Sequence, residues 1–242
     1  MGGTTAKICL MDDFTPDTDR VYEVDRSARF QKGSGLPLRI PVIDLFEIGA
    51  GGGSIAQVNA LRNIQVGPRS AGSEPGPACY GRGGIEPTVT DADAVLGLID
   101  PDGFAGGSVP LNLSASRLAL TTMGKPLDLS SDMAAFGVHE MVCESMANAA
   151  RVHAIEKGKS IGHHTLIAFG GAAPLQAAQS GAITVAHRIA AHRGIGVTLQ
   201  RVFDRAQPGR VEQGRRVCIG AHGKAGILIH REAFGFGAVF GF

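Results

Sequence analysis

The first 60 residues alternate between short apolar runs and groups of Gly, Pro and Asp, a pattern typical of β-strands and their connections. We predict strands at residues 6–11, 21–24, 38–48 and 55–58. Pro37 and Pro41 place the third strand at a sheet edge, because proline cannot donate to a strand ladder. Residues 67–91 are rich in Gly and Pro and show little periodicity, which predicts an extended loop.

Two helices are predicted in the middle of the chain. The first covers residues 115–123, with Ser114 as its N-cap and Gly124 at its end. The second begins at position 131 or 132 and continues to position 157, where Gly158 ends it.

The longer helix has one apolar face. Its apolar residues recur at spacings of three and four, which predicts that this side is buried. The face consists of Ala135, Val138, Val142, Ala149 and Val152, with Ser145 on the same line. Beside it lie Glu144, Asn148 and Arg151, which we expect to satisfy one another or a neighbouring loop, a ligand role being the alternative.

A short apolar run at residues 165–169 follows, and the glycines Gly170 and Gly171 end it. A run that is apolar at every position is typical of a central strand covered on both faces. Strands, glycine turns and helices in this order predict an α/β or α+β domain built on a sheet.

Composition narrows the class of protein. The chain has 242 residues, 44% hydrophobic and 19% charged, with a net charge of +1, so collagen-like and disordered classes are excluded. No apolar run reaches the ~18 residues that a membrane helix needs, and no signal segment is evident, so we expect a cytoplasmic protein without a membrane partner. The four cysteines are far apart in sequence and are expected to be thiols.

The charge changes sign near residue 177. Residues 1–176 hold 14 basic and 19 acidic residues, whereas residues 177–242 hold 9 basic and 3 acidic residues. A nucleic-acid arm would be denser in Lys and Arg and poorer in large apolar residues, so we do not expect nucleic-acid binding. We predict one domain over residues 1–178 and an irregular, Arg-rich tail over residues 179–242, frame-shifted or disordered.

Two glycine turns beside strands could bind phosphate. Gly2, Gly3 and Thr4 precede the first strand, and Gly170 and Gly171 follow the apolar strand. Glycines let backbone N–H groups approach an oxyanion, and a threonine hydroxyl adds a donor. Each turn taken alone is more often an ordinary turn, but nucleotide-binding folds place their ligands outside strand ends.

Other candidate motifs are incomplete. His139 and Cys143 share a helix face at zinc-ligand spacing, but no third ligand is evident, so packing is the better interpretation. Ser54 lies in a near-match to a nucleophile elbow without identifiable partners. The acids that could bind a cation or reach a site are Glu74, Glu86, Asp91, Asp93, Asp100 and Asp102. We identify no catalytic residue and no metal ligand.

Five blocks of sequence, taken together, carry a resemblance to a known family. MGGTTAKICL, IPVIDLFEIGAGGGSIA, VGPRSAGSEPGPACYGRGGIEPTVTDADAVLG, ESMANAARVHAIEKGK and TLIAFGGAAPLQAA resemble the hydantoinase A/5-oxoprolinase family. That family includes ATP-dependent N-methylhydantoinases, 5-oxoprolinases and related ketone carboxylase subunits. The blocks occur in the family's order from residue 1 to about 178, roughly three quarters of the chain.

The resemblance implies an actin/sugar-kinase/Hsp70-like (ribonuclease H-like) ATPase fold, in which two related halves close on a nucleotide. It implies ATP and Mg²⁺ as cofactors and a small cyclic amide as substrate, whose ring opens after phosphorylation of its carbonyl oxygen. By the same resemblance, Gly2, Gly3 and Thr4 form the second phosphate loop and Gly170 and Gly171 meet the adenosine. Gly51, Gly52, Gly53 and Ser54 are expected to line the active cleft.

The chain also departs from the family pattern. The first ATPase half and the acidic residue before the phosphate loop are absent, and Gln176 stands where histidine is usual. We therefore expect a fragment that carries the second ATPase half and is inactive in isolation. Its partner would be the missing N-terminal half or a second hydantoinase-type subunit. The alternative is a non-catalytic subunit or interaction module of a hydantoinase or ketone carboxylase-type complex.

Overall fold

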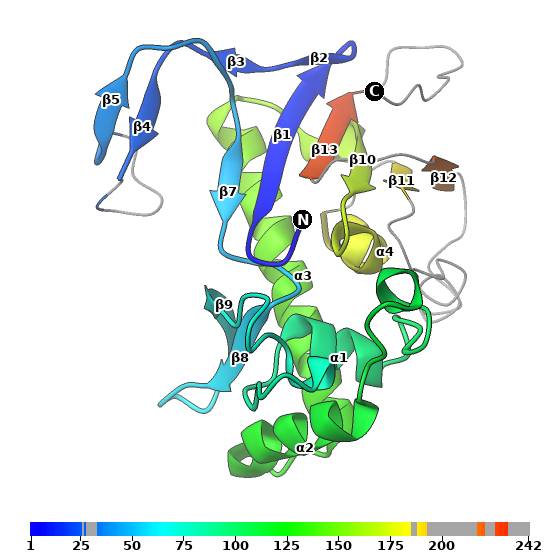
Figure 1. The fold of residues 1–242 in the computed structure, drawn as a ribbon. Helices are drawn as coiled ribbons and strands as arrows, with labels where there is room; N and C mark the ends of the chain where they lie inside the picture. The colour runs from blue at the N-terminus through cyan, green and yellow to red at the C-terminus, as the bar shows by residue number, and fades with distance from the viewer. Residues whose placement is uncertain (26, 28–32, 185–187, 193–216, 221–225, 232–242) are drawn as a thin grey trace.

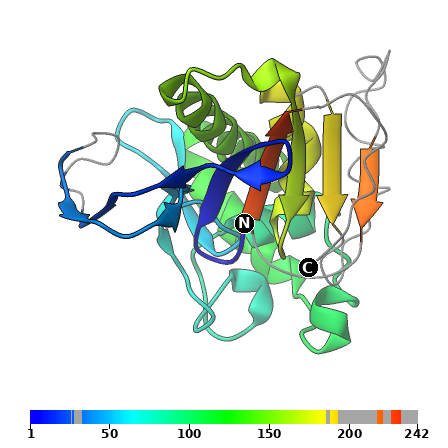
Figure 2. The same ribbon diagram turned by 90° about the horizontal axis from the view of Figure 1, so that it is seen from above.

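The computed structural model describes residues 1–25, 27, 33–184, 188–192, 217–220 and 226–231 as a mixed α/β protein. A seven-stranded sheet has the order β12-β11-β10-β13-β1-β2, and β7 also pairs with β1 (Figures 1 and 2). Its strands are β1 (Ala6–Asp12), β2 (Thr15–Pro16), β7 (Phe46–Ile48), β10 (His164–Phe169), β11 (Arg188–His192), β12 (Val217–Gly220) and β13 (Gly226–Arg231). β10 lies between β11 and β13, so the prediction of a central strand is confirmed.

Two helices, α3 (Ser131–Glu156) and α4 (Ala173–Thr184), pack against each other and against this sheet (Figure 1). The hydroxyl of Ser130 accepts a hydrogen bond from the backbone N–H of Met133 at 3.3 Å and begins α3, as an N-cap does. The predicted long helix is therefore confirmed. Its buried side is wider than the predicted stripe, because α1, α2 and α4 all contact it, but Ser145 is exposed, contrary to expectation.

A smaller unit of one hairpin and two helices packs against the other part of α3. It consists of β8 (Ser54–Val58), β9 (Ile64–Ser70), α1 (Val89–Val95) and α2 (Leu113–Gly124), with short 3₁₀ turns at Ala78–Tyr80, Phe104–Gly107 and Lys125–Leu127. The predicted loop over residues 67–91 is wrong at both ends, where β9 and α1 lie. α2 begins two residues earlier than predicted, because Asn112 rather than Ser114 accepts from the backbone N–H of Ala115.

The segment between β2 and β7 forms short ladders outside the main sheet (Figure 1). Here β3 (Thr18–Asp19) pairs with β6 (Val42–Ile43), and β4 (Tyr22–Val24) pairs with β5 (Leu36–Leu38). The predicted single strand over residues 38–48 is therefore three separate strands. Pro41 lies in the break between β5 and β6, consistent with its inability to donate to a ladder.

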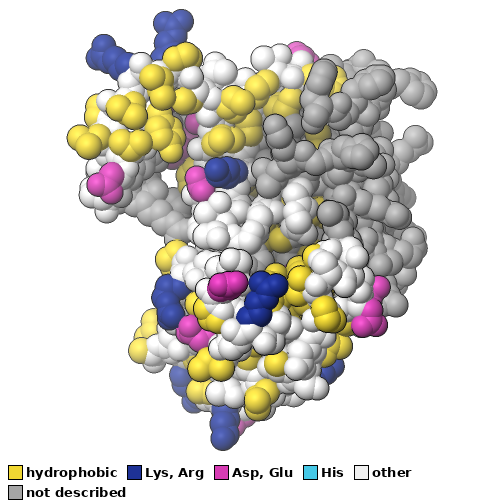
Figure 3. Space-filling model, in the orientation of Figure 1, with side chains coloured by type: hydrophobic (Ala, Val, Ile, Leu, Met, Phe, Trp, Pro, Cys, Tyr) yellow, Lys and Arg dark blue, Asp and Glu magenta, His cyan; other side chains and the backbone are white. Residues whose placement is uncertain are grey.

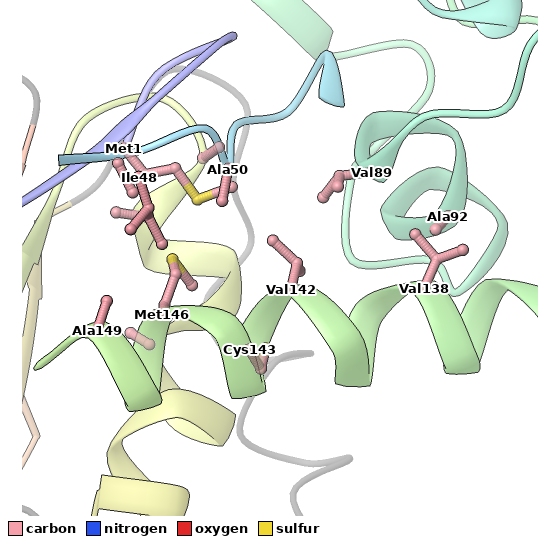
Figure 4. Packing of buried hydrophobic residues seen from close by; sticks show 14 of the residues in the cluster. Met1, Ile48, Ala50, Val89, Ala92, Val138, Val142, Cys143, Met146 and Ala149 are labelled. Carbon is pink, nitrogen blue, oxygen red and sulfur yellow. The ribbon is translucent and has the colours of Figure 1, made fainter. Parts of the chain in front are cut away.

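The core joins the sheet, α3 and α1. Figure 4 shows Met1 beside Ile48 and Ala50 above Met146 of α3, and Val138 of α3 below α1. All of these side chains are buried, and Met1 is 1% exposed. Burial of an apolar side chain of this size stabilises the fold by roughly 2 kcal/mol. The first residue of the chain is thus part of the core.

Three strands of the main sheet come from the region predicted to be an irregular tail. β13 pairs in parallel with β1 and antiparallel with β10. The segments 193–216, 221–225 and 232–242, to which the prediction of disorder also applies, lie outside the described residues, and the boundary at residue 178 stays a prediction. No helix in the described ranges has the length and apolar character needed to cross a membrane, and the cytoplasmic location stays a prediction.

One buried carboxylate connects the smaller unit internally. Asp91 is fully buried, and its two oxygens accept hydrogen bonds from the backbone N–H groups of Ala78, Cys79 and Thr88 and from the hydroxyls of Thr88 and Ser116, at 2.7 to 3.1 Å. A buried carboxylate is stable when its lone pairs are occupied in this way. Asp91 therefore holds the loop before α1 and the helix α2 to α1.

We expect Asp91→Asn to lower the free energy of unfolding by about 3 kcal/mol, because the amide NH₂ would face donors in place of an acceptor. The measurement is urea unfolding of the purified chain. Asp132→Asn is the control: Asp132 pairs with Arg117 at 2.9 Å, but its side chain is 60% exposed, so the loss should be under about 1 kcal/mol. Equal losses in the two variants would contradict this role of Asp91.

Candidate functional site

Residues 1–4 form a tight loop at the start of β1. The backbone N–H of Gly2 donates to the carbonyl of Thr5 at 3.1 Å, and the buried side chain of Met1 fixes the beginning of the loop. Gly3 and Thr4 are exposed and Gly2 is half-buried. The loop therefore presents its backbone and the Thr4 residue at the surface, while its first residue is held in the core.

A second glycine segment supports this loop from behind. The N–H groups of Gly52 and Gly53 donate to the carbonyls of Gly2 and Gly3 at 2.9 and 2.7 Å. A β-carbon on Gly51 would lie 2.5 Å from backbone atoms of Gly3 and Thr4, which is closer than real atoms approach. Gly51 and Gly53 are therefore glycines because two backbones pack directly against each other, whereas a β-carbon on Gly52 would lie 2.8 Å from the Thr90 hydroxyl.

Ser54 belongs to the same support. It is fully buried, and its hydroxyl accepts from the backbone N–H of Gly51 at 2.8 Å. The hydroxyl also lies 3.5 Å from the carbonyl of Gly49. These two contacts fix the Gly49–Ser54 turn, in agreement with the view that Ser54 is not a nucleophile.

The second predicted turn lies beside the first loop. Gly170 has a φ of +104°, a conformation that favours glycine, and it ends β10 just before α4. The backbone N–H of Ala172 donates to the carbonyl of Met1 at 3.3 Å. A β-carbon on Gly52 would lie 3.7 Å from the Ala172 β-carbon. The structure thus brings the three predicted glycine segments together, although they are up to 170 residues apart in sequence.

Three of these glycines have no steric cause among the described residues. A β-carbon on Gly2, Gly3 or Gly171 would have no atom of the described residues within 4 Å, and none of the three has a positive φ. A β-carbon on Gly158 would also have open space around it, but its φ of +65° explains the glycine at this position. An open glycine surface of this kind allows close approach of an external group to the backbone.

The other candidate residues lie elsewhere or have structural partners. His139 and Cys143 are buried against α1 and α4, which confirms the packing interpretation. Glu86 pairs with Arg69 at 3.0 Å, and Arg151 pairs with Glu144 at 3.6 Å as expected. Glu74, Asp100 and Asp102 do not form part of a metal-binding group: within the described ranges no three His, Cys, Asp or Glu side chains could hold an ion together.

Comparison with known proteins identifies the family. The profile of the hydantoinase/oxoprolinase family matches residues 1–199. The chain belongs to this hydantoinase/oxoprolinase family. It is 40% identical over 178 residues to the caprolactamase subunit alpha of Pseudomonas jessenii, an alignment that covers 72% of this chain and 24% of that subunit. It is 43% identical over 139 residues to the acetophenone carboxylase gamma subunit of Aromatoleum aromaticum, covering 57% of this chain and 19% of the relative.

A solved structure has a similar fold. The crystal structure of the ATP-dependent caprolactamase from Pseudomonas jessenii superposes with a TM-score of 0.61 at 33% identity, covering 77% of this chain and 27% of that one. The chain thus spans about a quarter of the length of the family members that it matches. The mixed α/β class is confirmed, whereas the actin-like classification stays a prediction.

The two kinds of glycine should respond differently to alanine. We expect Gly51→Ala to lower the free energy of unfolding by about 3 kcal/mol, because its β-carbon would collide with backbone. Gly3→Ala should leave stability unchanged or raise it by about 0.5 kcal/mol, because only the unfolded chain loses freedom. Urea unfolding of both variants measures this, and a large loss in Gly3→Ala would show that the fold itself requires this glycine.

Proposed function

We propose that this chain supplies one wall of the ATP site of a hydrolase that opens a cyclic amide, a lactam or a hydantoin. In this proposal Gly2, Gly3 and Thr4 bind the phosphates, and Gly170 and Gly171 lie against the adenosine. The observation that carries it is the open, non-strained glycine surface at positions 2, 3 and 171. Nothing among the described residues requires glycine at these three positions, whereas a nucleotide whose phosphates contact backbone N–H groups of the loop and whose adenosine lies against the turn favours it.

The residues present fit a triphosphate. Gly3 and Thr4 are exposed, the Thr4 hydroxyl is a donor, and no β-carbon blocks the approach to the loop. Gly51, Gly52, Gly53 and Ser54 are buried, and we therefore assign them to the support of the loop and not to contact with the ligand. Rigid support from behind keeps the donors in place before the anion arrives, which lowers the cost of binding.

Magnesium would enter with the nucleotide. The described residues include no three-ligand group for a metal ion, so its ligands would be phosphate oxygens, water and at most the Thr4 hydroxyl from this loop. When bound, ATP supplies the phosphoryl group that makes an amide carbonyl reactive towards water. The task of this chain is to orient that group and offset its charge, which is the main protein contribution to phosphoryl transfer.

The second wall would come from another part of a longer polypeptide or from a second hydantoinase-type subunit. The chain matches only about a fifth to a quarter of the length of relatives that are named as subunits. A nucleotide held on one side stays in contact with water, and hydrolysis of a phosphorylated amide needs a closed site. Ring opening therefore belongs, in this proposal, to the assembly of both walls.

Nucleotide binding tests the proposal. We expect the purified chain to bind AMPPNP with Mg²⁺, and Gly3→Ala to weaken this binding at least about tenfold, because a methyl group would displace the phosphates. Gly158→Ala is the reciprocal control: it should lose about 1 kcal/mol of stability through its positive φ and keep its affinity. Isothermal titration calorimetry and urea unfolding measure both quantities. Unchanged affinity in Gly3→Ala would exclude the phosphate-binding role.

Catalysis by the chain alone is a separate prediction. Because one wall cannot exclude water, the purified chain should show no ATP-dependent hydrolysis of hydantoin or 5-oxoproline. Product formation and ADP release are measured together. A turnover coupled to ATP that is lost in Gly3→Val would show that this chain contains a complete site.

The second candidate function is a non-catalytic interaction module. A specific observation favours it: large apolar side chains between β1 and β7 are exposed, and they gather over β4 and β5 in Figure 3. They include Phe14, Tyr22, Leu36, Leu38, Ile40, Ile43 and Leu45, each at least 45% exposed. Surfaces of this kind mark interfaces. Size-exclusion chromatography together with the AMPPNP titration distinguishes the two candidate functions. Hetero-assembly without AMPPNP binding favours the interaction module, and AMPPNP binding favours the enzyme part.

A further inference from the structure

Three helices meet at a second buried carboxylate. Asp93 of α1 is 1% exposed and its two oxygens have different partners. One oxygen lies 2.9 Å from Nδ1 of His139 on α3, and the other accepts from the side-chain NH₂ of Gln176 on α4 at 2.6 Å. A single side chain therefore holds α3 and α4 to α1, across sequence separations of 46 and 83 residues.

The two titratable neighbours in this network, His139 and Cys143, both have raised pKa values. Burial alone would lower the pKa of His139, but the hydrogen bonds to Asp93 and Cys143 outweigh it and raise the pKa to about 11. Because the pKa of His139 is raised, protonation of its ring beside Asp93 is favoured, and its Nε2 lies 3.6 Å from the Cys143 sulfur. Burial raises the pKa of the Cys143 thiol, which stays protonated and donates to the backbone carbonyl of Gln176 at 3.9 Å.

The network acts on α4 at the end that faces the proposed site. Gln176 is the fourth residue of α4, in the first turn after Gly170 and Gly171. Its side-chain NH₂ and its backbone carbonyl are bound within the network, whereas its buried Oε1 has no hydrogen-bond partner among the described residues. Asp93 therefore helps to fix the position of this first turn and of the two glycines before it.

The same short helix also contacts the support of the phosphate loop. Thr90 lies one turn before Asp93 on α1, and its N–H and hydroxyl both donate to the carbonyl of Gly52, at 2.7 and 2.8 Å. Gly52 in turn donates to the carbonyl of Gly2. α1 thus adds a second connection between the loop at residues 1–4 and the turn at residues 170–171, beside the direct hydrogen bond from the N–H of Ala172 to the carbonyl of Met1.

We infer that Gln176, held by Asp93, is a positioning residue that sets the Gly170–Gly171 turn at the adenosine side of the site. This inference rests on the proposed function. It assigns to Gln176 no contact with the nucleotide. Loss of its amide would let the first turn of α4 shift while the phosphate loop, which Gly52 and Gly53 hold, stays in place.

The test compares two probes that share the phosphates and differ in the adenosine. We expect Gln176→Met in the full chain to weaken AMPPNP–Mg²⁺ binding about tenfold and tripolyphosphate–Mg²⁺ binding less than about twofold. Gln176→His, which can still donate to Asp93, should bind AMPPNP within about threefold of the unsubstituted chain. Gln179→Met is the matched control, because Gln179 also joins α4 to α3, through Glu140 at 2.8 Å, but does not touch Asp93.

Each outcome decides between the alternatives. If Gln176→Met weakens both probes equally or neither, or if Gln179→Met reproduces its effect, the positioning role is wrong, even when Gly3→Ala abolishes binding of both probes. If the unsubstituted chain binds neither probe, the proposed function fails and this inference fails with it. Should Gln176→Met not fold, Gln176→Asn weakens the same hydrogen bond with less disturbance, and the same comparison of probes applies.

Discussion

The candidate site depends on one backbone contact, the pair of hydrogen bonds from Gly52 and Gly53 to the carbonyls of Gly2 and Gly3. Two chain segments can approach this closely only where neither carries a side chain on the facing surface. The contact turns the loop at the start of β1 into a rigid surface with one free side. The proposed nucleotide contacts lie on the exposed side of this loop. The buried glycines Gly51, Gly52 and Gly53 pack against its other side.

The short helix α1 places this contact within the rest of the molecule. Thr90 binds Gly52, Asp91 holds the preceding loop and α2, and Asp93 holds α3 and α4. Both carboxylates are buried, which would be costly if they were unpaired, and each has donors on both oxygens. Because these bonds are directional, they fix the relative positions of the helices more closely than apolar packing alone does.

The sequence predicts those elements whose signal is local. The long helix α3 follows from its apolar period and from Gly158, which ends it, and β10 follows from an apolar run that a glycine ends. α1 has seven residues, too few to show a period, and its signal lay in Thr88 and Asp91, which form a capping box. Asp91 is a candidate for binding in the sequence because it flanks the long loop rich in Gly and Pro, whereas three of its five donors, on Ala78, Cys79 and Ser116, are brought to it only by the fold.

Sequence alone also could not separate the two kinds of glycine. Gly51 and Gly3 are the same letter in similar motifs, but one faces backbone at 2.5 Å and the other faces open space. This difference bears on the choice between an enzyme part and an interaction module. A chain that had only to fold and to dock would be more stable with alanine at positions 2, 3 and 171, since glycine costs entropy on folding and nothing in the described surroundings excludes a methyl group. Glycine at positions 2 and 3 of the exposed loop and at position 171 of the neighbouring turn is accounted for by the nucleotide that we propose, and the apolar surface over β4 and β5 does not account for it.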